Sequence, residues 1–235
     1  MQRKIITTSD GSKTIQIEDW NEQYHSIHGA IQEANHVFIK HGLLFFFELN
    51  RHTDHSQNLS VYGALNILEI GFGTGLNALL TLLEAEKIKQ RVNYVGVEAY
   101  PVESNEINQL NYVELISQEH EAEFETIHKA SWETQHEITP NFQLEKQEKF
   151  FKDIESENEF DIIYFDAFGA RVQPELWTED MFTIMYKALK TNGVLVTYSA
   201  KGSVRRAMLA VGFKVERLPG PPGKREMLRA QKKSY

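Results

Sequence analysis

The sequence predicts an α/β fold in which strands alternate with helices around a glycine-rich turn. Residues 65–70 (LNILEI) form a short, mostly apolar run, and three glycines follow at two-residue spacing. Leu76 then opens an apolar pattern at helical spacing. Glycine adopts backbone angles that other residues avoid, and it lets a ligand lie against the main chain. A strand, a glycine turn and a helix in this order are typical of a Rossmann-like unit.

A second acidic residue makes this interpretation more specific. Residues 94–98 (YVGVE) form the next apolar run and end in Glu98. An acid at the end of the second strand of a βαβ unit is placed to accept both hydroxyls of a ribose. The glycine spacing differs from G-x-G-x-x-G. E-x-G-x-G-x-G, which begins at Glu69, instead resembles the S-adenosylmethionine-binding turn of class I methyltransferases. An ordinary tight βα turn is the alternative.

The composition limits the classes of protein to which the chain can belong. Its 235 residues suit one domain, or one domain with a small addition, and 41% of them are hydrophobic, which is enough for a sizeable core. The absence of cysteine excludes disulfides and thiolate chemistry. No run approaches the roughly 20 apolar residues of a membrane span. The first 12 residues lack the apolar centre of a signal peptide, so we expect a cytoplasmic protein.

The net charge of −8 is unevenly distributed. Residues 98–161 hold 17 acids and four lysines, a net charge of −13, whereas residues 201–235 hold ten basic residues and two acids, a net charge of +8. We interpret the acidic segment as a solvated face. The basic segment is either another solvated face or a nucleic-acid contact, because phosphate attraction depends on local basic clusters.

An N-terminal addition is predicted before the glycine turn. Two alternating runs, 4–8 and 13–18, flank Asp10-Gly11, which indicates a β-hairpin. Residues 27–38 then show helical spacing, and Gly42 is a plausible helix stop. We therefore divide the chain into a hairpin and helix at residues 1–60, packed on the core, and a main domain at residues 61–235.

The N-terminal helix region is rich in histidine. Its four histidines are His25, His28, His36 and His41. A metal site needs such side chains to converge with a defined geometry. Because the chain has no cysteine and no HExxH motif, we predict surface or pocket-lining histidines and no metal.

The later elements follow in α/β order. Residues 118–150 give no clear pattern apart from a candidate strand at 142–149. The predicted helices cover residues 76–87, 101–117, 178–189 and 201–211, and the predicted strands cover 142–149, 160–165, 194–199, 213–218 and 225–230. Asp166 and Phe168 follow the strand at 160–165 at its carboxyl end, the edge at which open α/β sheets bind ligands.

Several blocks of sequence resemble one specific family, the tRNA 5-methylaminomethyl-2-thiouridine methyltransferases. They are HGAIQEANHVFI at 28–39, EIGFGTGLN at 69–77, DAFGARVQPELWTEDMF at 166–182, TYSAKGSVRRAMLAVGF at 197–213 and GPPGKREML at 220–228. The glycine turn is generic, whereas the DAF…PELW and GKREML blocks are much more specific. The resemblance implies a class I methyltransferase with a seven-stranded, mostly parallel sheet in the order 3-2-1-4-5-7-6.

The resemblance also implies a reaction. A methyl group passes from S-adenosylmethionine to the primary amine of 5-aminomethyl-uridine, or its 2-thio form, at the wobble position of tRNA. Some family members carry a fused FAD-dependent oxidase. We expect that half to be absent here and a separate enzyme or pathway to supply the aminomethyl group. With no long exposed apolar stretch, a monomer is favoured.

An amine that attacks a methyl donor must be neutral. An alkyl amine titrates near pH 10, so neutralising it at pH 7 costs about 4 kcal/mol. A carboxylate beside the amine can orient it and accept its proton. Asp166 is the candidate for this catalytic role, because it lies at the strand end that faces the donor. The alternatives are that Asp166 caps the following turn or only positions the donor.

The remaining site residues follow from the resemblance and from the chemistry. The expected donor-binding residues are Glu69, Gly71, Phe72, Gly73, Gly75, Asn77, Glu98 and, for adenine, Glu148. The expected substrate-binding residues are Phe168, which either stacks on the uracil or packs in the core, and five basic residues for the tRNA backbone, Lys201, Arg205, Arg206, Lys224 and Arg225. Arg225 is alternatively paired with Glu226. Tyr24 and His25 belong to an element that could cover the donor pocket.

Three other functions compete with this one. The first is methylation of a small-molecule amine or a protein, which the acidic bulk of the chain favours. The second is binding of nucleotide or tRNA without catalysis, against which Glu98 and Asp166 argue. The third is a nicotinamide-dependent oxidoreductase, which the glycine spacing disfavours.

Overall fold

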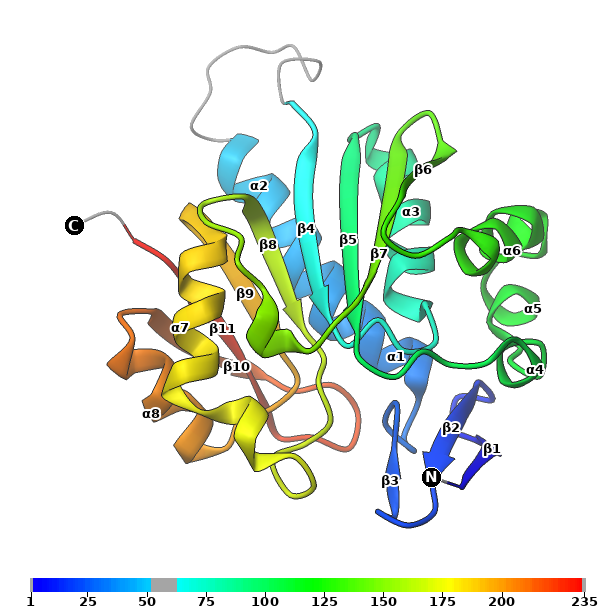
Figure 1. Cartoon of the computed structure of the whole chain (residues 1–235), viewed down its shortest axis with the longest axis horizontal. Helices are drawn as coiled ribbons and strands as arrows, with labels where there is room; N and C mark the ends of the chain where they lie inside the picture. Colours follow the sequence, from blue (N-terminus) through cyan, green and yellow to red (C-terminus); the bar gives the residue numbers. More distant parts are fainter. Residues whose placement is uncertain (1, 52–62, 234–235) are drawn as a thin grey trace.

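The protein forms a twisted eight-stranded sheet with helices on both faces (Figure 1). The computed structural model describes residues 2–51 and 63–233. The strand order is β10-β11-β9-β8-β4-β5-β7-β6. These strands are β4 (Leu65–Ile70), β5 (Val92–Glu98), β6 (Gln135–Thr139), β7 (Phe142–Glu148), β8 (Phe160–Phe165), β9 (Leu189–Thr197), β10 (Lys214–Pro219) and β11 (Glu226–Gln231).

Seven of the eight strands follow the predicted order 3-2-1-4-5-7-6, so the predicted fold is confirmed. The strands β7, β5, β4, β8 and β9 pair in parallel, and β11 runs antiparallel to both β9 and β10. The prediction of seven strands was one too few. The extra strand, β6, pairs antiparallel with β7 at the sheet edge, within the stretch that showed no clear pattern.

Two hydrophobic cores lie on the two faces of the sheet. Along β4, Ile67 packs into one core and Leu68 into the other, because successive side chains of a strand point to opposite faces. One face is covered by α1 (Ala30–Ala34), η1 (Asn35–Leu44), α2 (Phe45–Arg51), α3 (Leu76–Ile88) and α6 (Glu121–Lys129). The other is covered by η3 (Phe151–Asp153), η4 (Pro174–Trp177), α7 (Glu179–Ala188) and α8 (Gly202–Ala210).

The N-terminal helix does not stop at Gly42, so that prediction was wrong. The chain runs from α1 through a π-helical stretch, η1, directly into α2. A Cβ atom at Gly42 would lie 3.0 Å from Cε1 of Tyr164 and 3.1 Å from Cγ2 of Val196. The glycine is therefore explained by the close approach of the helix to β8 and β9.

A small three-stranded sheet precedes this helix. It consists of β1 (Arg3–Thr7), β2 (Lys13–Ile17) and β3 (Glu22–Gln23), and the predicted hairpin is its β1–β2 pair. Figure 1 shows it beside the carboxyl edge of the large sheet. The predicted boundary between residues 60 and 61 lies outside the described residues, so the two-part division stays a prediction.

The helix predicted over residues 101–117 is broken in two. α4 (Ser104–Ile107) and α5 (Tyr112–Ile116) are followed by η2 (Gln118–His120). Asn111 lies in the break and binds the hairpin turn: its Oδ1 accepts the Lys13 N–H at 2.8 Å, and its Nδ2 donates to the Gly11 carbonyl at 3.1 Å. The break thus attaches the small sheet to the main body.

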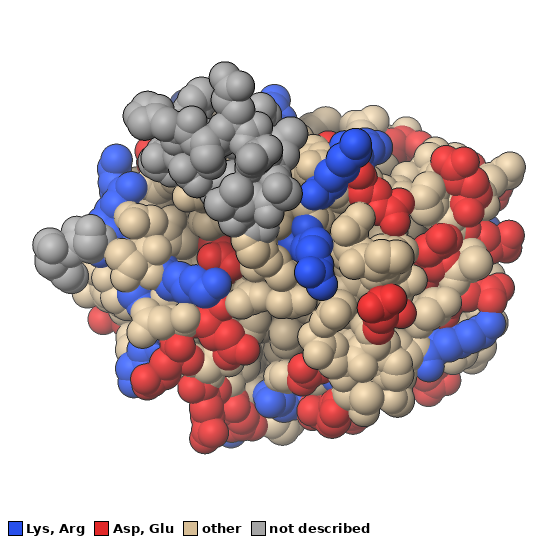
Figure 2. Space-filling view, turned by 90° about the horizontal axis from the view of Figure 1, so that it is seen from above, with Lys and Arg blue, Asp and Glu red and all other residues tan. Residues whose placement is uncertain are grey.

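The surface charge follows the asymmetry of the sequence. Figure 2 shows acidic side chains gathered at the end of the molecule formed by α4, α5 and α6, whereas acidic and basic side chains are mixed at the opposite end. None of the described helices is long and apolar enough to cross a membrane.

Candidate active site

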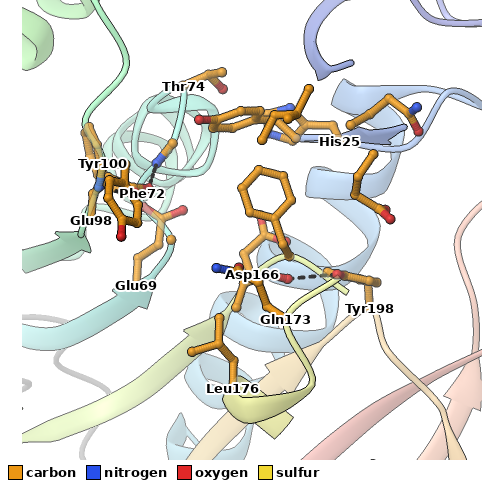
Figure 3. A pocket seen from close by; sticks show the side chains of 18 of the residues that line it. His25, Glu69, Phe72, Thr74, Glu98, Tyr100, Asp166, Gln173, Leu176 and Tyr198 are labelled. Atoms are coloured by element: carbon orange, nitrogen blue, oxygen red, sulfur yellow. Dashed lines mark hydrogen bonds between the residues drawn. The ribbon is translucent and has the colours of Figure 1, made fainter. Parts of the chain in front are cut away.

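A cavity of about 520 Å³ opens at the carboxyl edge of the parallel strands. Small-molecule sites typically measure about 300–1,000 Å³. The cavity lies between the glycine turn, the ends of β5 and β8, and the N-terminal residues 20–27 (Figure 3). Of the predicted site residues, those that line it are Glu69, Gly71, Phe72, Gly73, Asn77, Glu98, Asp166, Phe168 and Lys224.

Asn77 joins the two acids that end neighbouring strands. Its Nδ2 donates to Oε1 of Glu69 at 2.7 Å and to Oδ2 of Asp166 at 2.9 Å. The hydroxyl of Tyr94 donates to the other oxygen of Glu69 at 2.8 Å. Oδ1 of Asn77 is buried and has no hydrogen-bond partner within the described part of the chain. The amide therefore fixes both carboxylates at the cavity wall and leaves one acceptor free.

Burial dominates the electrostatics of these acids. It raises the pKa of Glu69 well above its usual value, and the neighbouring Asp166 raises it further. Burial also raises the pKa of Asp166, as does the charge of Glu33, whereas the Asn77 hydrogen bond and Lys224 oppose that rise. A cation that enters the cavity would stabilise the ionised forms of these acids. The cavity is thus suited to a positively charged ligand.

The glycine turn and Glu98 form one hydrogen-bonded unit. The Gly73 N–H donates to Oε2 of Glu98 at 3.1 Å, and the Tyr100 N–H donates to Oε1 at 3.0 Å. Gly71 has a φ of +87°, and a Cβ there would lie 2.8 Å from the Asp166 carbonyl oxygen. Each carboxylate oxygen has a second lone pair, so Glu98 can also accept from two ligand hydroxyls.

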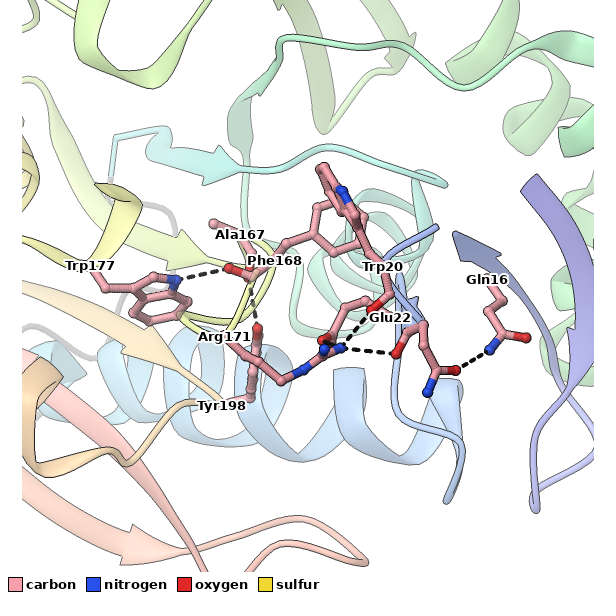
Figure 4. Close-up of polar contacts among 9 residues, drawn as sticks. Gln16, Trp20, Glu22, Ala167, Phe168, Arg171, Trp177 and Tyr198 are labelled. Carbon is pink, nitrogen blue, oxygen red and sulfur yellow. Dashed lines mark hydrogen bonds and ion pairs between the residues drawn. The ribbon is translucent and has the colours of Figure 1, made fainter. Parts of the chain in front are cut away.

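Aromatic residues close the cavity above Asp166. The ring of Phe168 meets those of Tyr24 and Trp20 edge-on, at centroid distances of 4.9 and 5.7 Å. Arg171 ties the same loop to the small sheet: its guanidinium donates to the carbonyl oxygens of Trp20 and Asn21 at 2.9 Å and forms an ion pair with Glu22 at 2.6 Å (Figure 4). Two segments distant in sequence thus form one cover.

Lys224 lies in the cavity rather than on an open surface. It forms an ion pair with Glu33 of α1, and its Nζ lies 3.8 Å from the centroid of the Tyr198 ring. The hydroxyl of Tyr198 donates to the Ala167 carbonyl at 2.8 Å. The structure therefore separates Lys224 from the other predicted basic residues.

Six predicted residues do not line this cavity. Gly75 immediately precedes α3, and a Cβ there would lie 3.0 Å from the His128 ring. Glu148 is exposed at the end of β7. The other four are basic: Lys201, Arg206 and Arg225 are exposed, and Arg205 is half-buried on α8.

The sequence analysis missed several residues of the cavity. Glu33 is one of them, although an acid on the apolar face of a predicted helix is a recognisable signal. Tyr100 and Phe150, both about half exposed, are others; their rings lie 6.1 Å apart at the rim. The position of Phe150, just after a parallel strand, could have indicated it.

Tyr24 and His25 do line the cavity, as expected of an element that covers it. Burial lowers the pKa of His25 to about 4, so its ring is neutral at physiological pH. Within residues 2–51 and 63–233, no group of three or more His, Asp or Glu side chains could hold a metal ion.

Comparison with known proteins identifies related chains. A family model described as S-adenosyl-L-methionine-dependent methyltransferase matches residues 112–233, just over half of the chain. The tRNA 5-methylaminomethyl-2-thiouridine biosynthesis bifunctional protein MnmC of Hydrogenovibrio crunogenus is 26% identical over 95% of this chain and 33% of its own length. The protein of the same name from Leptospira interrogans is 29% identical over 90% and 32%.

Two solved structures are also similar to this chain. The crystal structure of MnmC2 from Aquifex aeolicus covers all of this chain and 71% of its own, with a TM-score of 0.78 and 27% identity. Spermidine synthase from Thermotoga maritima, 16% identical with a TM-score of 0.52, shares the fold. The chain spans about a third of the length of the curated relatives it matches. The resemblance seen in the sequence blocks is confirmed.

Proposed function

Because the chain belongs to the S-adenosyl-L-methionine-dependent methyltransferases and uses that cofactor, we propose that it methylates the primary amine of 5-aminomethyl-(2-thio)uridine at the tRNA wobble position. One observation carries the proposal. Asp166, a proton acceptor for an amine, is linked through Asn77 to Glu69 of the glycine turn, so acceptor and donor sites share one cavity. The names of the relatives supply the substrate.

The residues of the cavity fit S-adenosylmethionine. Glu98, already oriented by two backbone N–H groups, would accept from the ribose hydroxyls. The amino-acid end would lie against Glu69, Gly71, Phe72, Gly73 and Asn77, where the unpaired Oδ1 of Asn77 offers an acceptor for an ammonium. Tyr100 and Phe150 would hold the adenine at the rim, in place of Glu148. When bound, the cofactor supplies an electrophilic methyl group.

The chain's own part in the reaction is to position the amine and accept its proton. Asp166 would bind the ammonium of the substrate and take one proton, which leaves a lone pair on nitrogen for attack. A carboxylate in a buried, acid-rich site is a stronger base than one in water, because burial disfavours its charged form. Raising its pKa toward that of the amine makes the proton transfer less unfavourable.

The aromatic cover is suited to a base. Phe168, Trp20 and Tyr24 together form an apolar wall beside Asp166. Proteins hold unstacked bases of RNA against such rings. We propose that the wobble uracil lies against Phe168, with its aminomethyl arm directed to Asp166, and that residues 20–27 serve as the cover of the site.

The tRNA backbone would then lie along the basic C-terminal part of the chain. Lys201, Arg206 and Arg225 are exposed, and α8 also carries Arg205. A methyl transfer does not create the amine, so another catalytic unit must prepare it. We infer that the enzyme works in the cytoplasm, where tRNA is modified, and as a monomer, since one chain supplies the whole cavity.

Labelled cofactor and two tRNA pools test the function. One pool comes from cells that accumulate the 5-aminomethyl wobble uridine, and the other from cells that lack it. We expect label only in the first pool, recovered as the methylated nucleoside after digestion. Label in neither pool, with cofactor binding intact, would contradict the tRNA assignment and favour a small-molecule amine.

A further inference from the structure

Glu33 and Lys224 form an ion pair at the wall of the cavity. Glu33, on α1, is only 5% exposed. One of its oxygens accepts the backbone N–H of Ser26 at 3.1 Å, and the other accepts from Nζ of Lys224. A buried carboxylate fixed in this way needs a cation beside it, because an unpaired buried charge is strongly unfavourable.

Lys224 is also linked, through Tyr198 after β9, to the segment that carries Asp166. Its Nζ lies over the Tyr198 ring, and the Tyr198 hydroxyl binds the carbonyl of Ala167, the residue next to Asp166. A cation over an aromatic face is held by the ring's electrostatics. The ammonium of Lys224 is thus fixed between α1 and Tyr198 at the end of β9.

The loop before Lys224 is shaped to direct it inward. Nε2 of His36 binds the carbonyl of Pro219 at 2.8 Å at the start of the loop. Gly223, with a φ of +81°, lies against the ring of His28, where a Cβ would come within 2.0 Å of Cδ2. Only glycine allows this close approach, and the next side chain then enters the cavity.

We propose that the Glu33–Lys224 pair is a positioning element of the methyl-accepting pocket, in which Glu33 fixes Lys224 and Lys224 keeps Asp166 ionised to receive the substrate ammonium. This rests on the proposed function. Lys224 neither gives nor takes a proton: the N–H bond of the ammonium breaks, its electron pair stays on nitrogen, and the proton bonds to Asp166.

Charged groups from several elements act on the Asp166 carboxylate. Glu33 of α1 raises the pKa of Asp166, whereas Lys224 and the Asn77 amide of α3 lower it. Also facing the cavity are His25 from the segment before α1, Tyr198 after β9, Glu22 of β3 and Glu69 of β4. Without Lys224, the charge of Glu33 would act on Asp166 with no opposing effect from this cation, and the pKa of Asp166 would rise further.

Two substitutions should shift the pH profile in opposite directions. Lys224→Met should move the acid limb of kcat/KM to higher pH, by about one unit, and so lower kcat/KM about ten-fold at any pH on that limb. Glu33→Gln should move the limb to lower pH. Lys224→Arg, which keeps the charge, should restore most of the wild-type profile. Lys214→Met, on the same hairpin but exposed, is the matched control and should leave the profile unchanged.

A tRNA contact would give a different result. If Lys224→Met left the profile unmoved and only weakened tRNA binding, with a salt slope reduced by about one, Lys224 would be a phosphate ligand and the proposal would be wrong. If Lys224→Met failed to fold, an unshifted acid limb in Glu33→Gln would overturn the proposal equally.

A measurement without tRNA tests the role of the Glu33–Lys224 pair independently of the proposed methylation of tRNA. The carboxyl carbon of ¹³C-labelled Asp166, assigned by its loss in Asp166→Asn, can be titrated by NMR in each variant. We expect its midpoint to rise in Lys224→Met and to fall in Glu33→Gln. Equal midpoints would contradict the role of the pair, whether or not the wild-type enzyme methylates tRNA.

Discussion

Asn77 is the residue on which the donor and acceptor parts of the cavity converge. One amide group bonds to Glu69 at the end of β4 and to Asp166 at the end of β8. Such a bridge holds two buried carboxylates that would otherwise repel each other. The apo protein therefore carries acids in a site whose full stabilisation depends on a cationic ligand.

The free energy of unfolding should depend on pH because the Asp166 carboxylate is buried. Asp166 has a higher pKa folded than its usual value of 3.8, because of burial. The folded state therefore binds more protons than the unfolded state. The stability that Asp166 contributes is full below about pH 4 and is lost as the pH rises through its folded pKa. Asparagine does not ionise, so Asp166→Asn removes this loss of stability at high pH. We expect its free energy of unfolding to exceed that of wild type by more at pH 8 than at pH 5 in urea titrations; an equal difference at both would contradict this.

Which residues sequence analysis could find depended on local context. Glu69, Glu98 and Asp166 end apolar strands, and strand ends share one edge in a parallel sheet. Glu33 and Lys224 are 191 positions apart, and nothing local pairs them. Lys224 also sits beside Arg225 in a basic segment, which suggested a shared role that the loop geometry does not support.

The π-helical stretch η1 packs closely against β8 and β9 of the large sheet. Its Gly42 packs directly on Tyr164 and Val196. Because the helix continues into α2, this glycine is a packing feature rather than a helix end. Its role explains why a helix-stop rule failed here.

Gly42→Ala tests that packing. In an unobstructed helix, alanine would stabilise by about 0.5–1 kcal/mol. Here the added Cβ would meet two core side chains at 3.0–3.1 Å, so we expect a destabilisation of about 1–3 kcal/mol in urea unfolding. Gly202→Ala, where a Cβ meets only the flexible tip of Arg206, should change stability by less than about 0.5 kcal/mol. A stabilised Gly42→Ala variant would refute the packing role.

The strands at 65–70, 160–165 and 194–199 were predictable from their apolar runs, whereas the order of the strands followed from the family resemblance. The break between α4 and α5 could not be predicted, because Asn111 there forms hydrogen bonds to Gly11 and Lys13, which are distant in sequence. The edge strand β6 was also missed. It alternates exposed and half-buried side chains (Gln135 to Glu137), so it lacks the apolar run that marks the central strands.

Acidic side chains gather at one end of the molecule, whereas acidic and basic side chains are mixed at the other. The acidic end at α4–α6 is distant in sequence from the basic segment that contains α8 (Figures 1 and 2). A net charge of −8 would by itself disfavour RNA. Binding would then depend on the local basic cluster, and would be sensitive to salt.

Removing charges from α8 should change the salt dependence of tRNA binding. For Arg205→Ala combined with Arg206→Ala, we expect the slope of log Kd against log salt to fall by about two, since each phosphate contact contributes about one. Lys129→Ala, on the acidic α6, is the control and should leave the slope unchanged. A wild-type slope in the double arginine variant would rule out α8 as the tRNA contact.

The most direct test of the account compares turnover with cofactor binding in Asp166→Asn. Asp166 is proposed to accept the proton of the amine, while Glu98 and the glycine turn hold the cofactor separately. The account predicts that single-turnover methylation of tRNA falls by about 10²–10⁴-fold, with the Kd for S-adenosylmethionine, measured by calorimetry, within about three-fold of wild type. Methylation near the wild-type rate would contradict it.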